Sequence, residues 1–66
     1  MIRLKIKEEA EKQRIGQAKL SRLADVGLKT VQDVFRNPDN TNITLITLDK
    51  FAKALNVDPR DLIEPI

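Results

Sequence analysis

Residues 28–36 carry polar side chains whose types and spacing suit recognition by hydrogen bonds. If this segment is a helix, one of its faces carries a base, an amide, an acid and an exposed leucine. That face consists of Leu28, Lys29, Gln32, Asp33 and Arg36. An ammonium donates, a carboxylate accepts and an amide does both, so the face could match the polar edges of a partner. A solvated surface is the alternative interpretation.

The opposite face of the same segment indicates how it would be held. Val31, Val34 and Phe35 share that face, so we expect them to point into a core. The break at residues 25–27 precedes the segment, and the Asn-Pro pair at residues 37–38 disfavours helix after it. The pattern therefore predicts a helix over about residues 28–36.

Two further helices are predicted on the N-terminal side. Lys/Glu-rich sequence favours a first helix over about residues 4–14, with Gly16 after it. A second helix, over about residues 17–24, is indicated by apolar residues at helical spacing, namely Leu20, Leu23 and Ala24. A short apolar alternation precedes both helices and consists of Ile2, Leu4 and Ile6. We expect it to make core contacts at the start of the first helix, with a paired N-terminal strand as the alternative.

The C-terminal half predicts two more helices after a polar loop at residues 37–42. Thr44 is expected to cap the first of them, and Asn56 to end it in the left-handed conformation. Its apolar stripe contains Leu45, Leu48, Phe51, Ala52 and Leu55. Asp58 as N-cap, followed by Pro59 at the first helical position, predicts a fifth helix.

Composition limits the kind of chemistry that is possible. The 66 residues include no Cys and no His, so we expect no disulfide, no metal site, no cofactor and no enzymatic activity. A chain of this length buries roughly 60% of its extended surface, so its stability must come from helix packing or a partner subunit. The apolar run at the N-terminus is two residues long. It predicts neither a signal peptide nor a membrane span, so we expect a cytoplasmic, nucleoid-associated protein.

Charge is unevenly distributed along the chain. Residues 1–36 contain nine Lys/Arg against five Asp/Glu, a net charge of +4, whereas residues 37–66 contain three against five, a net charge of −2. A basic half joined to an acidic half favours a molecule that meets a polyanion with one end.

The segment from residue 17 to residue 34 resembles the helix-turn-helix motif of the phage-repressor (Xre/Cro-like) family. The matching residues are Gln17, Leu20, Ser21, Leu23, Val26, Thr30, Val31 and Val34. The tail TLITLDKFAKALNVDPRDLI, residues 44–63, resembles the fourth and fifth helices of that family. The resemblance implies one all-α, compact five-helix domain of the lambda-repressor-like type over residues 1–66. Ser21 is then small where two helices cross closely. An apolar seam is expected to fix that crossing, formed by Leu20, Leu23, Val26, Val31 and Val34.

Three positions depart from the family pattern. Asp25 stands where glycine is usual in the turn, and Asp tolerates the left-handed conformation better than most residues. Phe35 and Ala10 stand where an ion pair is common, which predicts an apolar contact in its place. Glu9 replaces a bulky apolar residue and is expected to reduce stability.

The resemblance implies a small transcriptional regulator that binds double-stranded DNA sequence-specifically. We expect it to act as a repressor. Bases would be read in the major groove by Leu28, Lys29, Gln32 and Asp33. The DNA backbone would be contacted by Gln17, Lys19, Arg22, Arg36, Asn37, Asn40 and Thr41. Asp33 could instead pair with Lys29 or Arg36 along the helix. For the loop at residues 37–42, a structural turn is an equal alternative to contact with phosphates. For Lys19 and Arg22, the alternative is that they are solvated surface charges.

A homodimer on two half-sites is expected. The predicted dimer surface consists of Leu62, Ile63 and Ile66; alternatively, Leu62 seals the core. A different class of function also fits the fold, because such a domain can serve as a protein-interaction module or as the antitoxin of a toxin–antitoxin pair. Binding that weakens steeply with salt would favour DNA over a protein partner.

Overall fold

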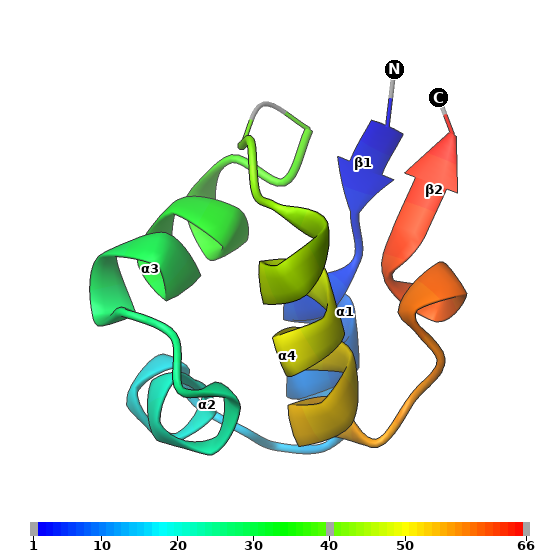
Figure 1. Cartoon of the computed structure of the whole chain (residues 1–66). Helices are drawn as coiled ribbons and strands as arrows, with labels where there is room; N and C mark the ends of the chain where they lie inside the picture. Colours follow the sequence, from blue (N-terminus) through cyan, green and yellow to red (C-terminus); the bar gives the residue numbers. More distant parts are fainter. Residues whose placement is uncertain (1, 40, 66) are drawn as a thin grey trace.

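The computed structural model describes residues 2–39 and 41–65. In chain order the elements are β1 (Ile2–Leu4), α1 (Ile6–Lys12), α2 (Gln17–Ala24), α3 (Leu28–Arg36), α4 (Leu45–Leu55), the 3₁₀ helix η1 (Pro59–Leu62) and β2 (Ile63–Pro65) (Figure 1). The bounds of α2 and α3 are those predicted from the sequence. Among the described residues, no helix is long and apolar enough to cross a bilayer.

The N-terminal residues form a strand, so the helix predicted over residues 4–14 is shorter than expected. β1 pairs with β2 in an antiparallel ribbon, with Ile2 opposite Pro65 and Leu4 opposite Ile63 (Figure 1). The extended backbone brings Leu4 into the core, where it is 6% exposed. The alternative of a paired N-terminal strand is therefore correct for residues 2–4, and Leu4 and Ile6 also make the predicted core contacts, whereas Ile2 is 58% exposed.

The predicted fifth helix is a single 3₁₀ turn. Asp58 caps it as predicted, because its Oδ1 accepts the Arg60 backbone N–H at 2.9 Å. Hydrogen bonds from the Arg60 side chain and backbone also hold the pKa of the Asp58 carboxyl below its ordinary value. The turn ends at Leu62 because Ile63 is extended (φ −126°, ψ 147°) and pairs with β1. The all-α, five-helix prediction is thus corrected, within residues 2–39 and 41–65, to four α-helices, one 3₁₀ turn and a two-stranded sheet.

The left-handed residues that end helices are largely those predicted. Asp25 ends α2 at φ 55° and Asn56 ends α4 at φ 56°. Thr44 caps α4, since its side chain accepts the Thr47 backbone N–H at 3.1 Å. After α1, however, Arg14 takes the left-handed conformation (φ 59°) ahead of the expected break at Gly16.

The core is built from β1, the four α-helices and η1. Its buried apolar side chains are Leu4, Ile6, Ala10, Leu20, Ala24, Val31, Val34, Phe51, Ala52, Leu55 and Leu62. Phe51, the largest of them, comes from α4, which stands between α3 and the ribbon (Figure 1). Phe35 packs partly buried against this core, which also contains Ala10, in keeping with an apolar substitute for an ion pair. Glu9 is partly buried on α1, where it accepts from the Gln13 amide at 3.1 Å and pairs with Lys12 at 3.6 Å.

Three leucines lie elsewhere than predicted. Leu62 is completely buried within a single chain, in agreement with the alternative that it seals the core. Leu23 is 51% exposed, so it is not a buried member of the seam predicted between α2 and α3. Leu45 is 83% exposed because the first turn of α4 lies beyond the core. Of the other predicted dimer residues, Ile63 is partly buried and Ile66 lies outside the described residues.

Candidate nucleic-acid interface

The turn between α2 and α3 is closed by a pair of hydrogen bonds around Ser21. The Ser21 hydroxyl donates to the Val26 carbonyl oxygen at 2.5 Å, and the Val26 N–H donates to the Ser21 carbonyl oxygen at 3.1 Å. Asp25 supplies the left-handed residue between them without a glycine. From the sequence, Ser21 was expected only to be small. A serine in the last turn of a helix, shortly before a left-handed residue, is the signal that points to this further role.

The two faces of α3 are those expected from its sequence. Val31 and Val34 are completely buried, and this anchors the helix. On the other side Leu28 is 44% exposed. Lys29 and Arg36 are exposed too, whereas Gln32 and Asp33 are partly exposed. The outward face is therefore accessible along the whole length of the helix.

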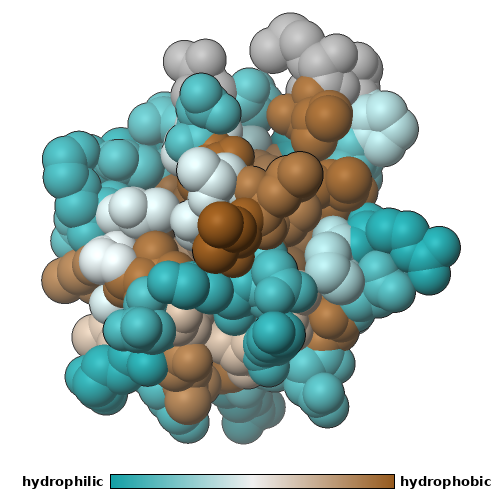
Figure 2. Space-filling view, viewed as in Figure 1, coloured by the Kyte–Doolittle hydropathy of each residue, from teal (hydrophilic) through white to brown (hydrophobic). Residues whose placement is uncertain are grey.

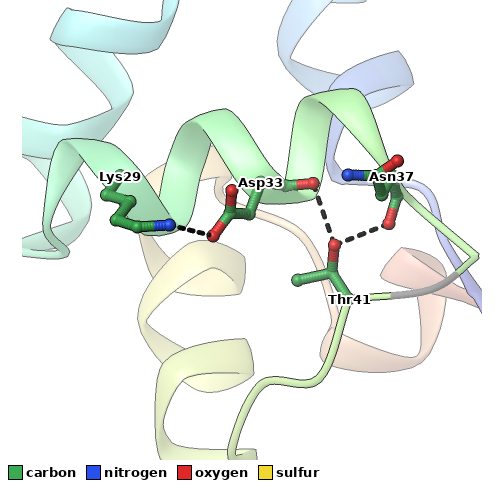
Figure 3. A network of polar contacts seen from close by, with 4 residues as sticks. All are labelled: Lys29, Asp33, Asn37 and Thr41. Carbon is green, nitrogen blue, oxygen red and sulfur yellow. Dashed lines mark hydrogen bonds and ion pairs between the residues drawn. The ribbon is translucent and has the colours of Figure 1, made fainter.

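Lys29 and Asp33 form an ion pair on the outward face of α3. The Lys29 ammonium nitrogen lies 3.2 Å from Asp33 Oδ2, and the two side chains are 86% and 40% exposed (Figure 3). Of the two intrahelical partners expected for Asp33, the structure selects Lys29. An exposed pair of this kind contributes about 0.3–0.5 kcal/mol, and the order with Lys first is the weaker one. The pair can therefore open at little cost when another partner approaches.

Thr41 closes the carboxyl end of α3. Its Oγ1 lies 2.9 Å from the Asp33 carbonyl oxygen and 2.6 Å from that of Asn37 (Figure 3). One hydroxyl proton serves both acceptors, so the Thr41 hydroxyl is engaged inside the protein. The Asn37 N–H also donates to the Asp33 carbonyl oxygen, at 2.8 Å. At Thr41 the loop therefore has the structural turn that was the predicted alternative to a phosphate contact.

The loop after α3 is also tied to the ribbon. The Leu4 N–H of β1 donates to the Pro38 carbonyl oxygen at 2.8 Å. Asn37 is exposed at the start of the loop, and Asn40 lies outside the described residues. Hydrogen bonds therefore tie Pro38 to β1 and Thr41 to the end of α3.

We expect Thr41→Val to destabilise the domain by about 1 kcal/mol. The change preserves the shape of the side chain and removes the proton that it donates to two carbonyl oxygens. Urea unfolding followed by circular dichroism measures the effect. Thr41→Ser retains the hydroxyl and should unfold close to wild type. Equal stability of Thr41→Val and wild type would contradict a structural role for this hydroxyl.

The segment that forms α2, the turn and α3 carries a small excess of positive charge. Residues 17–37 contain four Lys/Arg and two Asp, a net charge of +2. Gln17 and Lys19 in the first turn of α2 are exposed, as are Arg22 and Arg36. The first turn of α2 contains no acidic residue, so its free N–H groups face an approaching anion without a competing carboxylate. Within the described residues, no group of Cys, Asp and Glu is arranged to hold a metal ion.

A comparison with protein families bears on this arrangement independently. Residues 5–66 match the Cro/C1-type HTH DNA-binding domain. The match therefore spans all four α-helices, the closed turn between α2 and α3, and β2. Comparison with curated proteins found no match to the chain.

Proposed function

The chain belongs to the Cro/C1-type HTH DNA-binding domain family, and we propose that it is a sequence-specific transcriptional regulator that reads double-stranded DNA with α3. One observation supports this proposal most directly. Buried Val31 and Val34 hold α3 against the core, so its polar face points outward beside the basic side chains of α2. A helix presented in this way can enter the major groove of B-DNA.

Each outward residue of α3 suits a particular feature of the major groove. Gln32 can pair with adenine through both its donor and its acceptor, and Lys29 can donate to guanine. Leu28, 44% exposed, can pack on a thymine methyl group. Asp33 can accept from a cytosine amino group or remain paired with Lys29, with which it shares an ion pair of 3.2 Å.

The remaining polar residues would position the domain on the phosphates. Gln17 and Lys19 lie at the start of α2, where an anion is favoured, and Arg22 is exposed further along the helix. Arg36 and Asn37 would reach the backbone beyond the end of α3. We propose that Thr41 acts indirectly, by holding the loop, because its hydroxyl already serves two carbonyl oxygens.

We further propose that the protein works as a homodimer and represses by occluding a promoter. An acid in the middle of the reading face lowers the affinity of one domain for a polyanion. Two linked domains on two half-sites compensate for this, because the second contact becomes intramolecular. A pseudo-palindromic operator would then mirror the symmetry of the protein.

Selection from a random duplex library, followed by a salt titration on the recovered site, tests the proposal. We expect a palindromic site, and binding whose log–log dependence on salt has a slope of about −3 per protomer. That slope follows from about −0.9 for each phosphate neutralised by Lys19, Arg22 or Arg36.

A matched pair of variants isolates the interface. Arg22→Gln should make the slope shallower by about 0.9 per protomer. Lys53→Gln removes a charge from α4 that already pairs with Asp49 at 3.1 Å, and it should leave the slope unchanged. An empty selection, or duplex binding that does not respond to salt, would contradict the proposal and favour the protein-interaction or antitoxin alternative.

A further inference from the structure

The two members of the Lys29–Asp33 ion pair are held differently on the outward face of α3. The Lys29 side chain is 86% exposed and that of Asp33 only 40%. The backbone at Asp33 is also tied at its carbonyl oxygen, which accepts from the Asn37 N–H at 2.8 Å and from the Thr41 hydroxyl at 2.9 Å (Figure 3). Lysine carries its charge on a flexible four-carbon stem. Asp33 is therefore the fixed member, and it holds the adaptable Lys29 ammonium over the outward face.

The most exposed large hydrophobic side chains of the described residues lie elsewhere on the molecule. Leu45 is 83%, Ile46 72% and Ile2 58% exposed. Figure 2 shows hydrophobic side chains gathered in the upper half of the view, over the ribbon and the start of α4, whereas α3 lies on the side of α4 away from the ribbon (Figure 1). The Lys29–Asp33 pair therefore suits a partner that is recognised by hydrogen bonds more than one that buries apolar surface.

The pair presents a donor beside an acceptor at the spacing found on the edge of a base pair. The Lys29 ammonium nitrogen and Asp33 Oδ2 are 3.2 Å apart. In a G·C pair, the guanine O6 acceptor and the cytosine N4 donor are hydrogen-bonded to each other, so they lie about 2.9 Å apart, and both face the major groove. The ammonium and the carboxylate can therefore meet these two atoms at once without separating from each other.

We propose that Lys29 and Asp33 read one G·C base pair as a unit, with the ammonium at guanine O6 and N7 and the carboxylate at the cytosine amino group. The inference rests on the proposed function, which puts α3 in the major groove. It goes further because it assigns both side chains to the same base pair and gives that pair an orientation. In the reversed pair, C·G, the ammonium would face the amino group and the carboxylate would face O6, so both contacts would be repulsive.

The other two base pairs match the unit less well. An A·T pair has the donor and the acceptor in the same order as C·G, so it is rejected for the same reason. A T·A pair has the right order, but thymine carries a methyl group where guanine carries the N7 acceptor. The ammonium has three donors, so guanine gives it a second acceptor that thymine lacks.

Pairing with Asp33 also limits the attraction of α3 to DNA of any sequence. A free ammonium would bind phosphates regardless of the bases, and each such contact contributes about −0.9 to the salt slope. Residues 17–37 have a net charge of +2, so Asp33 offsets a large part of the positive charge of this segment. The unit therefore adds little to the binding of random DNA and acts where its base pair is present.

Selection from a random duplex library with wild type, followed by titration of single-base variants of the recovered site, tests the proposal. Lys29→Gln and Asp33→Asn should both lose preference for G·C, by at least about fivefold, at the same single position. Asp33→Asn should also bind random duplexes more tightly, with a salt slope steeper by about 0.9 per protomer, because Lys29 is then free to meet a phosphate. Loss of preference at two different positions, or unchanged preferences in Asp33→Asn, overturns the proposal.

Exchange of the two charges tests the orientation. The double variant Lys29→Asp/Asp33→Lys keeps the net charge, so its affinity for random DNA should stay at the wild-type value. It should fold at least as well as wild type, because an acid then stands in the first turn of α3, where none is present, and precedes its base by four residues. Urea unfolding verifies this. The preference should change from G·C to C·G, and a retained preference for G·C contradicts the proposal.

The ion pair between Asp49 and Lys53 on α4 provides the matched control. It has the same spacing in the sequence and an N–O distance of 3.1 Å, but it lies outside the outward face of α3. Asp49→Lys/Lys53→Asp should therefore retain every base preference. If wild type selects a site and Asp33→Asn keeps all its preferences, this inference fails and the proposed function stands. If wild type prefers no duplex, both fail.

Discussion

Replacing Leu62 by Ala should lower the free energy of unfolding by about 2–5 kcal/mol. Leu62 is completely buried at the end of η1, so the change removes core contacts and leaves a cavity. A domain of this size has a total stability of roughly 3–10 kcal/mol, so much of the population would unfold at physiological temperature. Urea unfolding followed by circular dichroism, at a concentration where the chain is monomeric, measures the loss.

Ile63→Ala provides the contrast. Ile63 is only partly buried against the core, so its truncation should cost less stability than that of Leu62. Leu62→Met nearly conserves volume and should cost less than about 1.5 kcal/mol. If Leu62→Ala unfolded like wild type but dimerised poorly, the side chain would belong to the dimer surface predicted from the sequence and not to the core.

The reason that Leu62 was assigned to the surface shows where local sequence signals fail. Asp58 and Pro59 correctly predict the start of a helical turn, because capping depends on neighbouring residues. Where that turn ends depends on β1, whose Leu4 pairs with Ile63, some 59 residues away in the chain. A strand of three residues is too short to give a clear sequence pattern and is not stable alone. The sequence therefore allowed a strand at residues 2–4 as an alternative but did not favour it over a helix.

Helices whose ends depend on nearby residues were predictable. The break at residues 25–27 and the Asn-Pro pair at residues 37–38 define α3, and Thr44 and Asn56 define α4. The stripe on α4 was right for Phe51 and wrong for Leu45, because helical periodicity gives the direction of a side chain and not the extent of the core. The exposure of Leu45 and Ile46 at the start of α4 was therefore not predicted.

The candidate site, too, was predictable in some features and not in others. Which residues of α3 point outward follows from its period, and the burial of Val31 and Val34 agrees with it. The choice of Lys29 as the partner of Asp33, and the two carbonyl oxygens served by Thr41, depend on side-chain rotamers and on the path of the loop. Spacing along the chain does not determine either of these.

For recognition of DNA, the largest single-residue effect is expected for Gln32→Ala. A bidentate contact to adenine contributes about 1–3 kcal/mol of discrimination, so affinity for the preferred site should fall roughly 5- to 150-fold and one base position should become degenerate. Alanine is the strongest helix former, so α3 should remain intact, and urea unfolding checks that it does. Titration of the preferred site and of its single-base variants measures both effects.

Lys19→Ala serves as the comparison, because an exposed Lys at the start of α2 can meet phosphates but no base from there. It should weaken binding to all duplexes alike and make the salt slope shallower by about 0.9 per protomer, with every base preference retained. Gln32→Ala should do the reverse: its slope stays constant while one preference disappears. The two variants therefore separate residues that read bases from residues that position the domain on the phosphates.

An equal loss of affinity for preferred and random DNA in Gln32→Ala would show that this amide does not read a base. Base reading would then have to rest on Leu28, Lys29 and Asp33.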